Sequence, residues 1–430
     1  MPRPPLASLD RGPAVNWLLM DLNAYFASAE QQARPELRGK PVAVAALDTP
    51  NTVCIAASYE ARPFGVKTGV KLSEARRLCP ELVLVEARPK VYVEYHHKIL
   101  AALERCVPVS QVLSIDEAAC RLTGLERWLP NALAIAQAVK QELRGVGEVL
   151  RCSIGLAPSR YLAKVASDMQ KPDGLTVLLE SELPQALFKL ALRDLPGVGP
   201  RTEERLRHKG VHTVEQLCAF DRDGLRRLWG GIWGERMWHW LRGADFDMPE
   251  SERKSLSRQH VLAPEHRSRA AAFPVVQKLL HSAAAELRRL DLWTGDLAVK
   301  VKFLGGDIDR RGAPLGYAER KDWHAHRRLA PCRDSFQMQS ILAELWKDCP
   351  EAKPLLVAVA LSDLTASADA PPALFTPAGE QRATRANAVM DDLNRRFGAQ
   401  TLLPASLQTV RNAARPAIGF RRTPEVEDLE

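Results

Sequence analysis

Three acidic residues stand where their side chains could bind divalent cations. Asp21 follows the apolar run VNWLLM at 15–20, and Asp116 and Glu117 follow VSQVLSI at 109–115. Both segments read as strands, so we expect the acids at two strand ends, where they converge if the strands are neighbours. Phosphoryl transfer mainly needs positioning and neutralised charge, and two Mg²⁺ ions held by such carboxylates supply both.

Spacing alone also permits a plainer interpretation, because an acid at a strand end commonly caps a helix or lies in a solvated turn. The sequence around each acid favours a catalytic role over these structural ones. Four segments stand in order along the chain: MDLNAYFASAE (20–30), AASYEARPFGVKTG (56–69), SIDEA (114–118) and APSRYLAKVASDMQKPDG (157–174). Together they resemble the motifs of the Y family of lesion-bypass DNA polymerases (UmuC, DinB and ImpB-MucB-SamB type). The resemblance implies a low-fidelity, template-directed DNA polymerase of translesion synthesis and DNA repair, which adds dNMP to a primer 3′-hydroxyl.

The resemblance gives each acid a role. It implies that Asp21, Asp116 and Glu117 hold two Mg²⁺ ions, with the backbone carbonyl of Leu22 completing one metal's shell. It also implies that Glu117 lies nearest the primer 3′-hydroxyl. Asn23 stands where an acid is common, but the family does not use that side chain as a ligand.

The resemblance further predicts the nucleotide site. Tyr59, Arg62 and Lys171 match residues that hold the triphosphate of the incoming dNTP, and the planar fork of Arg suits paired phosphate oxygens. Phe26 corresponds to the steric gate, the ring that excludes ribonucleotides by collision with the 2′-hydroxyl. Tyr25 is open to two interpretations, a nucleotide contact or ordinary core packing.

The expected fold class is α+β and multidomain, the right hand of a Y-family polymerase. We expect a palm with a ferredoxin-like core, small fingers, a thumb with a helix-hairpin-helix, and a little finger. The expected bounds are 1–32 with 88–180 for the palm, 33–87 for the fingers, 181–243 for the thumb, 244–255 for a linker, 256–364 for the little finger and 365–430 for a C-terminal tail. The charged, turn-rich sequence of the linker lacks periodicity.

Two segments are candidates for holding primer-template DNA. LPGVGPRTEERL at 195–206 resembles a helix-hairpin-helix, in which Gly197 and Gly199 permit a tight turn facing a phosphate and Arg201 adds positive charge. A plain helix C-cap is the alternative use of such glycines. These contacts would position the duplex without reading its sequence.

The second segment, LAVKVKF at 297–303, alternates as a half-buried strand does. We expect its valines and Phe303 to face a core and Lys300 and Lys302 to point outward. Taken alone, this pattern indicates a strand with one solvent-exposed face. The resemblance implies that the segment is instead the DNA-binding strand of the little finger.

The tail segment PPALFTP at 371–377 resembles the region of UmuC-type polymerases that docks on the sliding clamp. Only Leu374 and Phe375 match, so a generic exposed Leu-Phe pair is the alternative. The resemblance also makes a UmuD-like or other mutasome partner and a damage-induced (SOS) response conceivable.

Composition sets outer limits. The chain has 430 residues, with 60 Lys and Arg against 52 Asp and Glu and a net charge of +8, which suits a polyanionic partner. Its eight cysteines form no CxxC pair, so we expect buried, reduced thiols. Neither a signal peptide nor an apolar run of membrane-spanning length is recognisable, so we expect a cytoplasmic protein without membrane contact.

Two rival functions need consideration. A non-catalytic, polymerase-derived DNA-binding scaffold of a mutasome would have lost the metal-binding acids, whereas this chain keeps all three. A phosphate-handling enzyme of unrelated fold would not carry the helix-hairpin-helix or the strand-rich C-terminal block.

Overall fold

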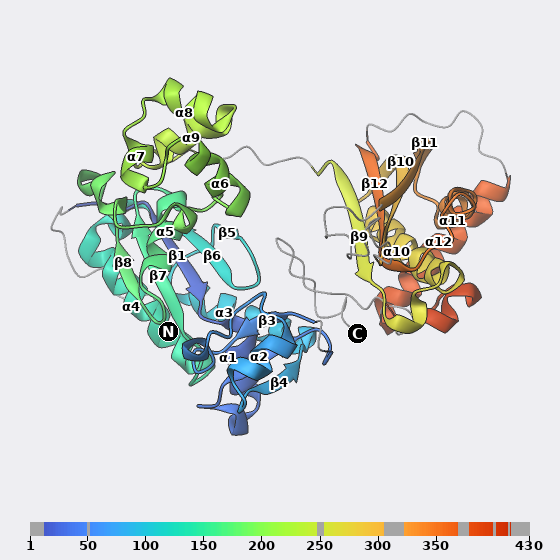
Figure 1. The fold of residues 1–430 in the computed structure, drawn as a ribbon, viewed down its shortest axis with the longest axis horizontal. Helices are drawn as coiled ribbons and strands as arrows, with labels where there is room; N and C mark the ends of the chain where they lie inside the picture. The colour runs from blue at the N-terminus through green and yellow to red at the C-terminus, as the bar shows by residue number, and fades with distance from the viewer. Residues whose placement is uncertain are drawn as a thin grey trace, which may run out of the picture. The chain divides into compact units, whose positions relative to one another are not determined.

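The protein is described here from a computed structural model. It describes residues 13–49, 52–246, 253–304, 322–368, 378–398, 401–411 and 413. The chain forms two compact units, one containing the described residues up to 246 and the other those from 253 onward (Figure 1). None of the helices in these ranges combines the length and apolar character that a membrane crossing requires.

A five-stranded sheet in the order β5-β6-β1-β7-β8 forms the base of the first unit. The central strand β1 (Trp17–Leu22) is buried at all six positions and pairs antiparallel with both neighbours. This explains its nearly continuous apolar sequence, because a central strand is covered on both faces. The other strands are β5 (Gln111–Val112), β6 (Glu117–Arg121), β7 (Cys152–Ala157) and β8 (Leu175–Val177).

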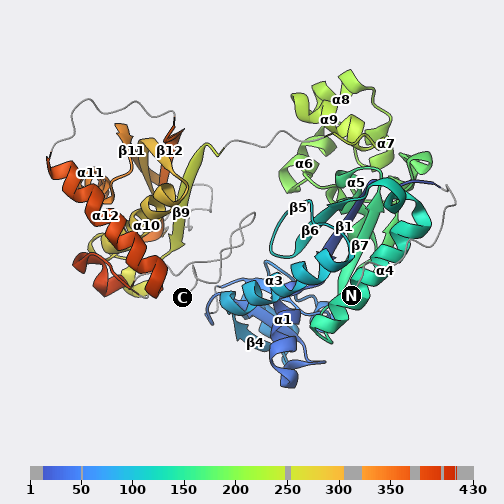
Figure 2. The same cartoon turned by 180° about the vertical axis from the view of Figure 1, so that it is seen from behind.

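Helices cover both faces of this sheet. The neighbouring helices α3 (Pro89–Cys106) and α4 (Leu129–Val146) lie on the side nearer the viewer in Figure 2. On the other face, α5 (Arg160–Met169) packs closely on β7 and β1. A β-carbon at Gly155 would come 2.0 Å from the carbonyl oxygen of Ala163, so only glycine lets α5 approach this closely.

A smaller three-stranded sheet, β3-β2-β4, lies between α1 (Tyr25–Ala33) and α3 in the chain. Its strands are β2 (Val42–Ala45), β3 (Cys54–Ala57) and β4 (Val83–Glu86), with helix α2 (Leu72–Leu78) and the short 3₁₀ helices η1 (Pro35–Leu37) and η2 (Arg62–Phe64). Small residues such as Ala43, Ala45 and Ala75 fill its core, which keeps this part of the unit compact.

Four helices end the first unit: α6 (Pro200–His208), α7 (Val214–Cys218), α8 (Arg222–Trp229) and α9 (Ile232–Trp240). Their core is continuous with that of α5. Tyr161 of α5 stacks on Trp240 of α9, with ring centroids 4.9 Å apart and planes inclined by 9°. The other short 3₁₀ helices described in this unit are η3 (Gly124–Arg127), η4 (Glu180–Glu182), η5 (Gln185–Leu187) and η6 (Leu192–Asp194).

The second unit is an antiparallel sheet in the order β11-β10-β12-β9 with helices packed on it. Val299 and Val301 of β10 are buried and Lys300 is exposed, so the predicted alternation is confirmed. Its elements are β9 (Ser255–Val261), η7 (Pro264–His266), α10 (Arg269–Arg289), β10 (Leu292–Phe303), β11 (Asp322–Cys332), α11 (Ser335–Trp346), β12 (Pro354–Ala366), α12 (Ala378–Phe397) and η8 (Ala405–Val410).

Part of the expected C-terminal tail packs on this second unit. Arg288 of α10 donates to both carboxylate oxygens of Asp391 in α12, at 2.6 and 2.8 Å. Leu407 and Val410 of η8 belong to the hydrophobic core of the unit. All eight cysteines of the chain lie in described parts of the structure, buried and with free thiols, as predicted.

Candidate active site

Asp21 and Glu117 face each other across two neighbouring strands. β1 and β6 are antiparallel, and their register places Asp21 directly opposite Glu117. Residues directly opposite in an antiparallel pair lie on the same face of the sheet, with their β-carbons close together. Alternation along β1 places Asp21 on the same face as Trp17 and Leu19, which is the face that α5 covers.

The prediction that Asp116 and Glu117 lie at the end of a strand is wrong. The segment 109–119 is not one strand, because the chain turns between β5 and β6 and the acids stand at the beginning of β6. The backbone N–H of Leu113 donates to the carbonyl of Glu117 at 2.9 Å and closes this turn. Antiparallel pairing requires this arrangement, since the end of β1 can only meet the beginning of β6.

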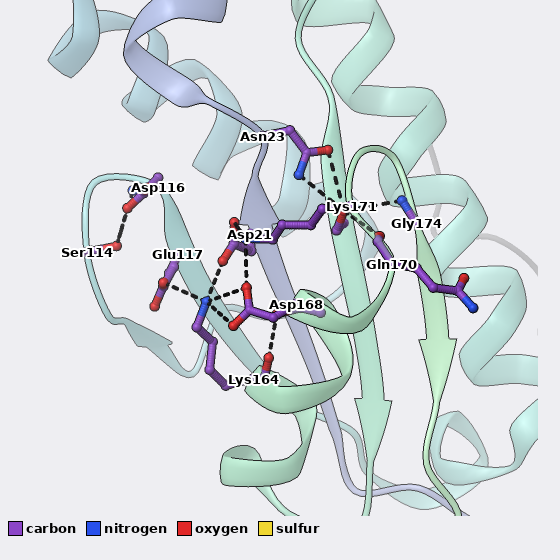
Figure 3. Close-up of polar contacts among 12 residues, drawn as sticks. Asp21, Asn23, Ser114, Asp116, Glu117, Lys164, Asp168, Gln170, Lys171 and Gly174 are labelled. Atoms are coloured by element: carbon purple, nitrogen blue, oxygen red, sulfur yellow. Dashed lines mark hydrogen bonds and ion pairs between the residues drawn. The ribbon is translucent and has the colours of Figure 1, made fainter. Parts of the chain in front are cut away.

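Asp116 lies beside the pair but has a different partner. Its carboxylate accepts a hydrogen bond of 2.5 Å from the hydroxyl of Ser114, and it turns toward Ser114 in Figure 3. Its backbone carbonyl accepts from the N–H of Leu22 at 2.9 Å, which ties the turn to β1. Burial raises the pKa of Asp116, and the charge of Asp21 raises it further. Within the described residues, no three acidic, His or Cys side chains already form a metal-binding cluster.

Lys164 of α5 lies among the acids. Its ammonium group is 2.5 Å from Asp21 Oδ2, 2.9 Å from Glu117 Oε1 and 3.0 Å from Asp168 Oδ2 (Figure 3). Burial alone would lower the pKa of Lys164, but these three carboxylates outweigh it and raise the pKa. Lys164 and Asp168 were not singled out in the sequence, where a Lys and an Asp four residues apart indicate an ordinary pair on a helix surface.

Lys171, a predicted triphosphate contact, also reaches Asp21. Its ammonium group is 2.6 Å from Asp21 Oδ1 and 2.8 Å from Asp168 Oδ1. Burial opposes the charge of Lys171, but Asp21 and Asp168 raise its pKa above the usual value. Two ammonium groups therefore face the negative charge of Asp21.

Asn23 fixes the loop that carries Lys171. This buried side chain accepts from the backbone N–H of Asp173 at 2.7 Å and donates to Ser153 Oγ at 3.1 Å. Ser153 in turn donates to the carbonyl of Gln170 at 3.1 Å. These contacts of Asn23 explain why an oxygen acceptor at this position is useful.

The two aromatic residues of the first motif occupy different environments. Tyr25 is buried, and its hydroxyl donates to the backbone carbonyl of Tyr92 at 2.5 Å. Phe26 is half-buried and stacks on the Tyr92 ring. The Tyr92 hydroxyl donates to the fully buried Glu30, which Arg88 also contacts. Tyr25 therefore belongs to the core, whereas the ring of Phe26 packs against the ring of Tyr92.

Tyr59 and Arg62 form a separate pair beyond β3. The Arg62 guanidinium lies over the Tyr59 ring, 3.9 Å from its centroid. The Tyr59 hydroxyl is a buried polar atom with no hydrogen-bond partner in the described structure. Within the described residues, no hydrogen bond or ion pair joins Tyr59 or Arg62 to the acids or to Lys171.

The predicted DNA-binding residues are distributed over both units. Gly197 has φ of 90°, which favours glycine, and Gly199 precedes α6 in an extended conformation. Arg201 is exposed on α6. In the second unit, Lys300 is paired with Asp322 at 2.8 Å, and Lys302 is half-buried. The candidate clamp residues Leu374 and Phe375 lie outside the described residues.

Three family models match successive parts of the chain. The impB/mucB/samB family model matches residues 20–168, which contain all three acids. The model described as DNA polymerase-iota, thumb domain matches 193–245, and the impB/mucB/samB family C-terminal domain matches 253–373.

Individual proteins agree with these matches. The chain is 37% identical to DNA polymerase IV of Moorella thermoacetica over 63% of this chain and 69% of that protein. It is 33% identical to DNA polymerase IV 1 of Bacillus subtilis, over 66% and 69% of the two chains. A solved Y-family DNA polymerase chimera of Dbh and Dpo4 has the same fold, with a TM-score of 0.65 and 21% identity over 81% of this chain and 99% of its own. The chain therefore belongs to the Y family of translesion DNA polymerases.

Proposed function

We propose that this protein adds deoxynucleoside monophosphates from dNTPs to the 3′ end of a primer paired with a template, with low fidelity and past damaged bases. The observation that carries this proposal is the pairing of Asp21 with Glu117 across β1 and β6, with Asp116 adjacent. These are the acids expected to perform nucleotidyl transfer, and rigid strands hold two of them face to face.

The chemistry of the site suits two Mg²⁺ ions. Asp21, Asp116, Glu117 and the carbonyl of Leu22 offer only hard oxygen ligands, which Mg²⁺ prefers. Burial raises the pKa of Glu117, Lys164 opposes that rise, and the neighbouring charges of Asp21 and Asp116 add to it. A divalent cation would relieve the repulsion among these acids. When bound, such ions activate the attacking hydroxyl and stabilise the leaving pyrophosphate.

The remaining residues would hold the triphosphate. Lys171 supplies a positive charge beside Asp21, at the edge of the proposed metal site. The Arg62 fork can bind two phosphate oxygens while its plane rests on Tyr59. The buried Tyr59 hydroxyl without a partner is a donor that a phosphate oxygen would satisfy. Phe26, stacked on Tyr92, is our candidate for the gate against the 2′-hydroxyl.

Primer-template DNA would be held through its phosphates. The turn at Gly197 and Gly199, with the exposed Arg201, and the strand that carries Lys300 and Lys302 are the proposed contacts. We keep the domain bounds given above as the working division of this hand. Low fidelity follows from small fingers and from the lack of a recognisable exonuclease segment in the sequence, because neither strong induced fit nor editing is then available.

Partners and location extend the proposal. We propose a cytoplasmic enzyme, produced in response to DNA damage, that can work with a UmuD-like or other mutasome partner.

Leu374 and Phe375 are the proposed contact with the sliding clamp. Replacing both with Ala should reduce primer extension only on clamp-loaded DNA, because tethering raises local concentration without altering the chemistry. Equal extension by both proteins on such DNA would reject this contact.

Primer extension on an undamaged template tests the main proposal. Asp21→Ala, Asp116→Ala and Glu117→Ala should each abolish extension and leave primer-template binding nearly intact, because the duplex contacts lie elsewhere. Normal extension by all three variants would reject the site. Loss of DNA binding together with activity would indicate misfolding, which a melting curve of each variant detects.

A further inference from the structure

One ammonium group neutralises carboxylates from three elements of the first unit. Lys164 Nζ contacts Asp21 of β1, Glu117 of β6 and Asp168 of its own helix α5, all within 3.0 Å. The Lys164 side chain is 21% exposed and that of Asp21 only 4%, so solvent screens these charges weakly. Figure 3 shows the three carboxylates arranged around this nitrogen.

The β1–β6 pairing makes a positive charge at this point necessary. Asp21 and Glu117 are directly opposite each other, and like charges in that relation destabilise a pair of strands. Lys164 reaches both because α5 packs directly on the face that carries them. In the protein without metal, its ammonium therefore compensates the same charges that a divalent cation would.

Asp168 gives Lys164 a second place to bind. It lies one helical turn further along α5, and its two oxygens contact both Lys164 and Lys171. An ammonium group that left Asp21 and Glu117 would still have Asp168 as a partner. The same lysine therefore has partners both inside and outside the acid pair.

We propose that Lys164 is a positioning residue of the polymerase site. Its ammonium holds Asp21 and Glu117 face to face before metal binds, and it transfers to Asp168 when a divalent cation takes its place. The inference rests on the proposed role of Asp21 and Glu117 as metal ligands. It implies that Lys164 competes with the metal and that Asp168 weakens this competition.

Mn²⁺ binding to the full chain without DNA or nucleotide, followed by electron paramagnetic resonance, tests the proposal. Lys164→Met should bind Mn²⁺ more tightly and Asp168→Asn more weakly, each by roughly three- to tenfold, the range expected of single partly screened ion pairs. Lys164→Met should also lower the melting temperature of the metal-free protein, because Asp21 and Glu117 then repel each other. Lys164→Arg keeps the charge and should restore that melting temperature.

Two further variants show which residues cause these effects. Lys140 forms a comparably short, partly buried pair with Asp173 at 2.6 Å, so Lys140→Met should lower stability without changing the Mn²⁺ affinity. In the double variant Lys164→Met with Asp168→Asn, the second change should have much less effect than it has alone. Any remaining effect measures the share of Lys171, which also contacts Asp168.

The outcomes separate this inference from the proposed function. Weaker or unchanged Mn²⁺ binding in Lys164→Met would overturn the competition. An equal effect of Asp168→Asn with and without Lys164 would assign the effect to Lys171 and overturn the transfer. If Asp21→Asn leaves Mn²⁺ binding unchanged, or if no binding is measurable in the unaltered protein, the proposed metal site itself fails.

Discussion

Phe26 stacks on Tyr92, with ring centroids 4.5 Å apart and planes inclined by only 13°. Tyr92 is fully buried and cannot move away, because its hydroxyl donates to Glu30 at 2.7 Å and accepts from the backbone N–H of Arg88 at 3.0 Å. Phe26 is thus a half-buried ring on a rigid support. This is what a residue that rejects a substrate by collision requires, since a gate that gives way discriminates poorly.

Replacing Phe26 with Ala should raise ribonucleotide incorporation by orders of magnitude and change dNTP incorporation comparatively little. The proposed metal ligands and Arg62 would remain in place, and only the space proposed for the sugar would grow. Incorporation efficiencies for rNTP and dNTP, measured beside a melting curve, check this result. Unchanged sugar selectivity in a well-folded variant would reject the gate.

The matched control is Tyr25→Ala, the neighbouring aromatic with a buried ring and a bonded hydroxyl. Truncating a buried aromatic typically costs about 3–5 kcal/mol of stability. This variant should therefore melt earlier and keep its sugar selectivity. A change in selectivity at Tyr25 instead of Phe26 would exchange the two roles.

Asn23→Ala should raise the KM for dNTP, by about tenfold, because the loop carrying Lys171 loses its tie to β1. The change leaves the partly buried N–H of Asp173 without its acceptor, which should cost about 1 kcal/mol, the low end of the range for a lost acceptor. Steady-state kinetics and a melting curve check both effects. Asn23→Asp retains an oxygen acceptor and should keep a KM near that of the unaltered protein, so equal KM values in all three proteins would contradict this role.

Glu30 should make stability depend on pH. Burial raises its pKa, but hydrogen bonds from Arg88, Tyr92 and Arg34 outweigh that effect and hold the pKa below the usual 4.5. A lowered folded-state pKa means that the stabilisation is fully present above pH 4.5 and is lost as the pH falls below it. Melting temperatures of the protein and of Glu30→Gln should therefore differ at neutral pH and converge on acidification.

At neutral pH, the free energy of unfolding of Glu30→Gln should be lower than that of the unaltered protein by about 1–3 kcal/mol, the cost of weakening a buried charged hydrogen-bond network. The control is Glu142→Gln, whose partly exposed pair with Arg105 should contribute at most about 1 kcal/mol. Parallel pH curves for the protein and Glu30→Gln would show that the Glu30 carboxylate is not the source of the acid sensitivity.

Binding to primer-template should fall steeply with salt and depend little on sequence. Each phosphate contact contributes a slope of roughly −0.9 in log–log form, so Arg201→Ala should reduce the slope by about that amount. Arg207→Ala should change it less, because Arg207 is already paired with Glu203 at 2.9 Å. A salt-independent affinity, or equal effects of the two variants, would contradict a phosphate contact at Arg201.

The sequence predicted that Asp21 and Glu117 lie close together and that β10 alternates, because both predictions rest on local strand patterns. The turn between β5 and β6 was not predicted, because residues 113–116 include no glycine or proline that would mark a turn. Lys164 was missed for a different reason. Its distance from Asp21 along the sequence is large, and only the packing of α5 on the sheet brings the two together.

Gly155 shows how a residue without a functional group can limit the evolution of an enzyme. Any other residue there would place a β-carbon 2.0 Å from the Ala163 carbonyl, next to Lys164, and would push α5 off the sheet. A single added methyl would thus increase the distance between Lys164 and the two acids, Asp21 and Glu117. Random substitution should be tolerated less at this position than at many polar ones, and saturation mutagenesis under selection for lesion bypass should recover almost only glycine.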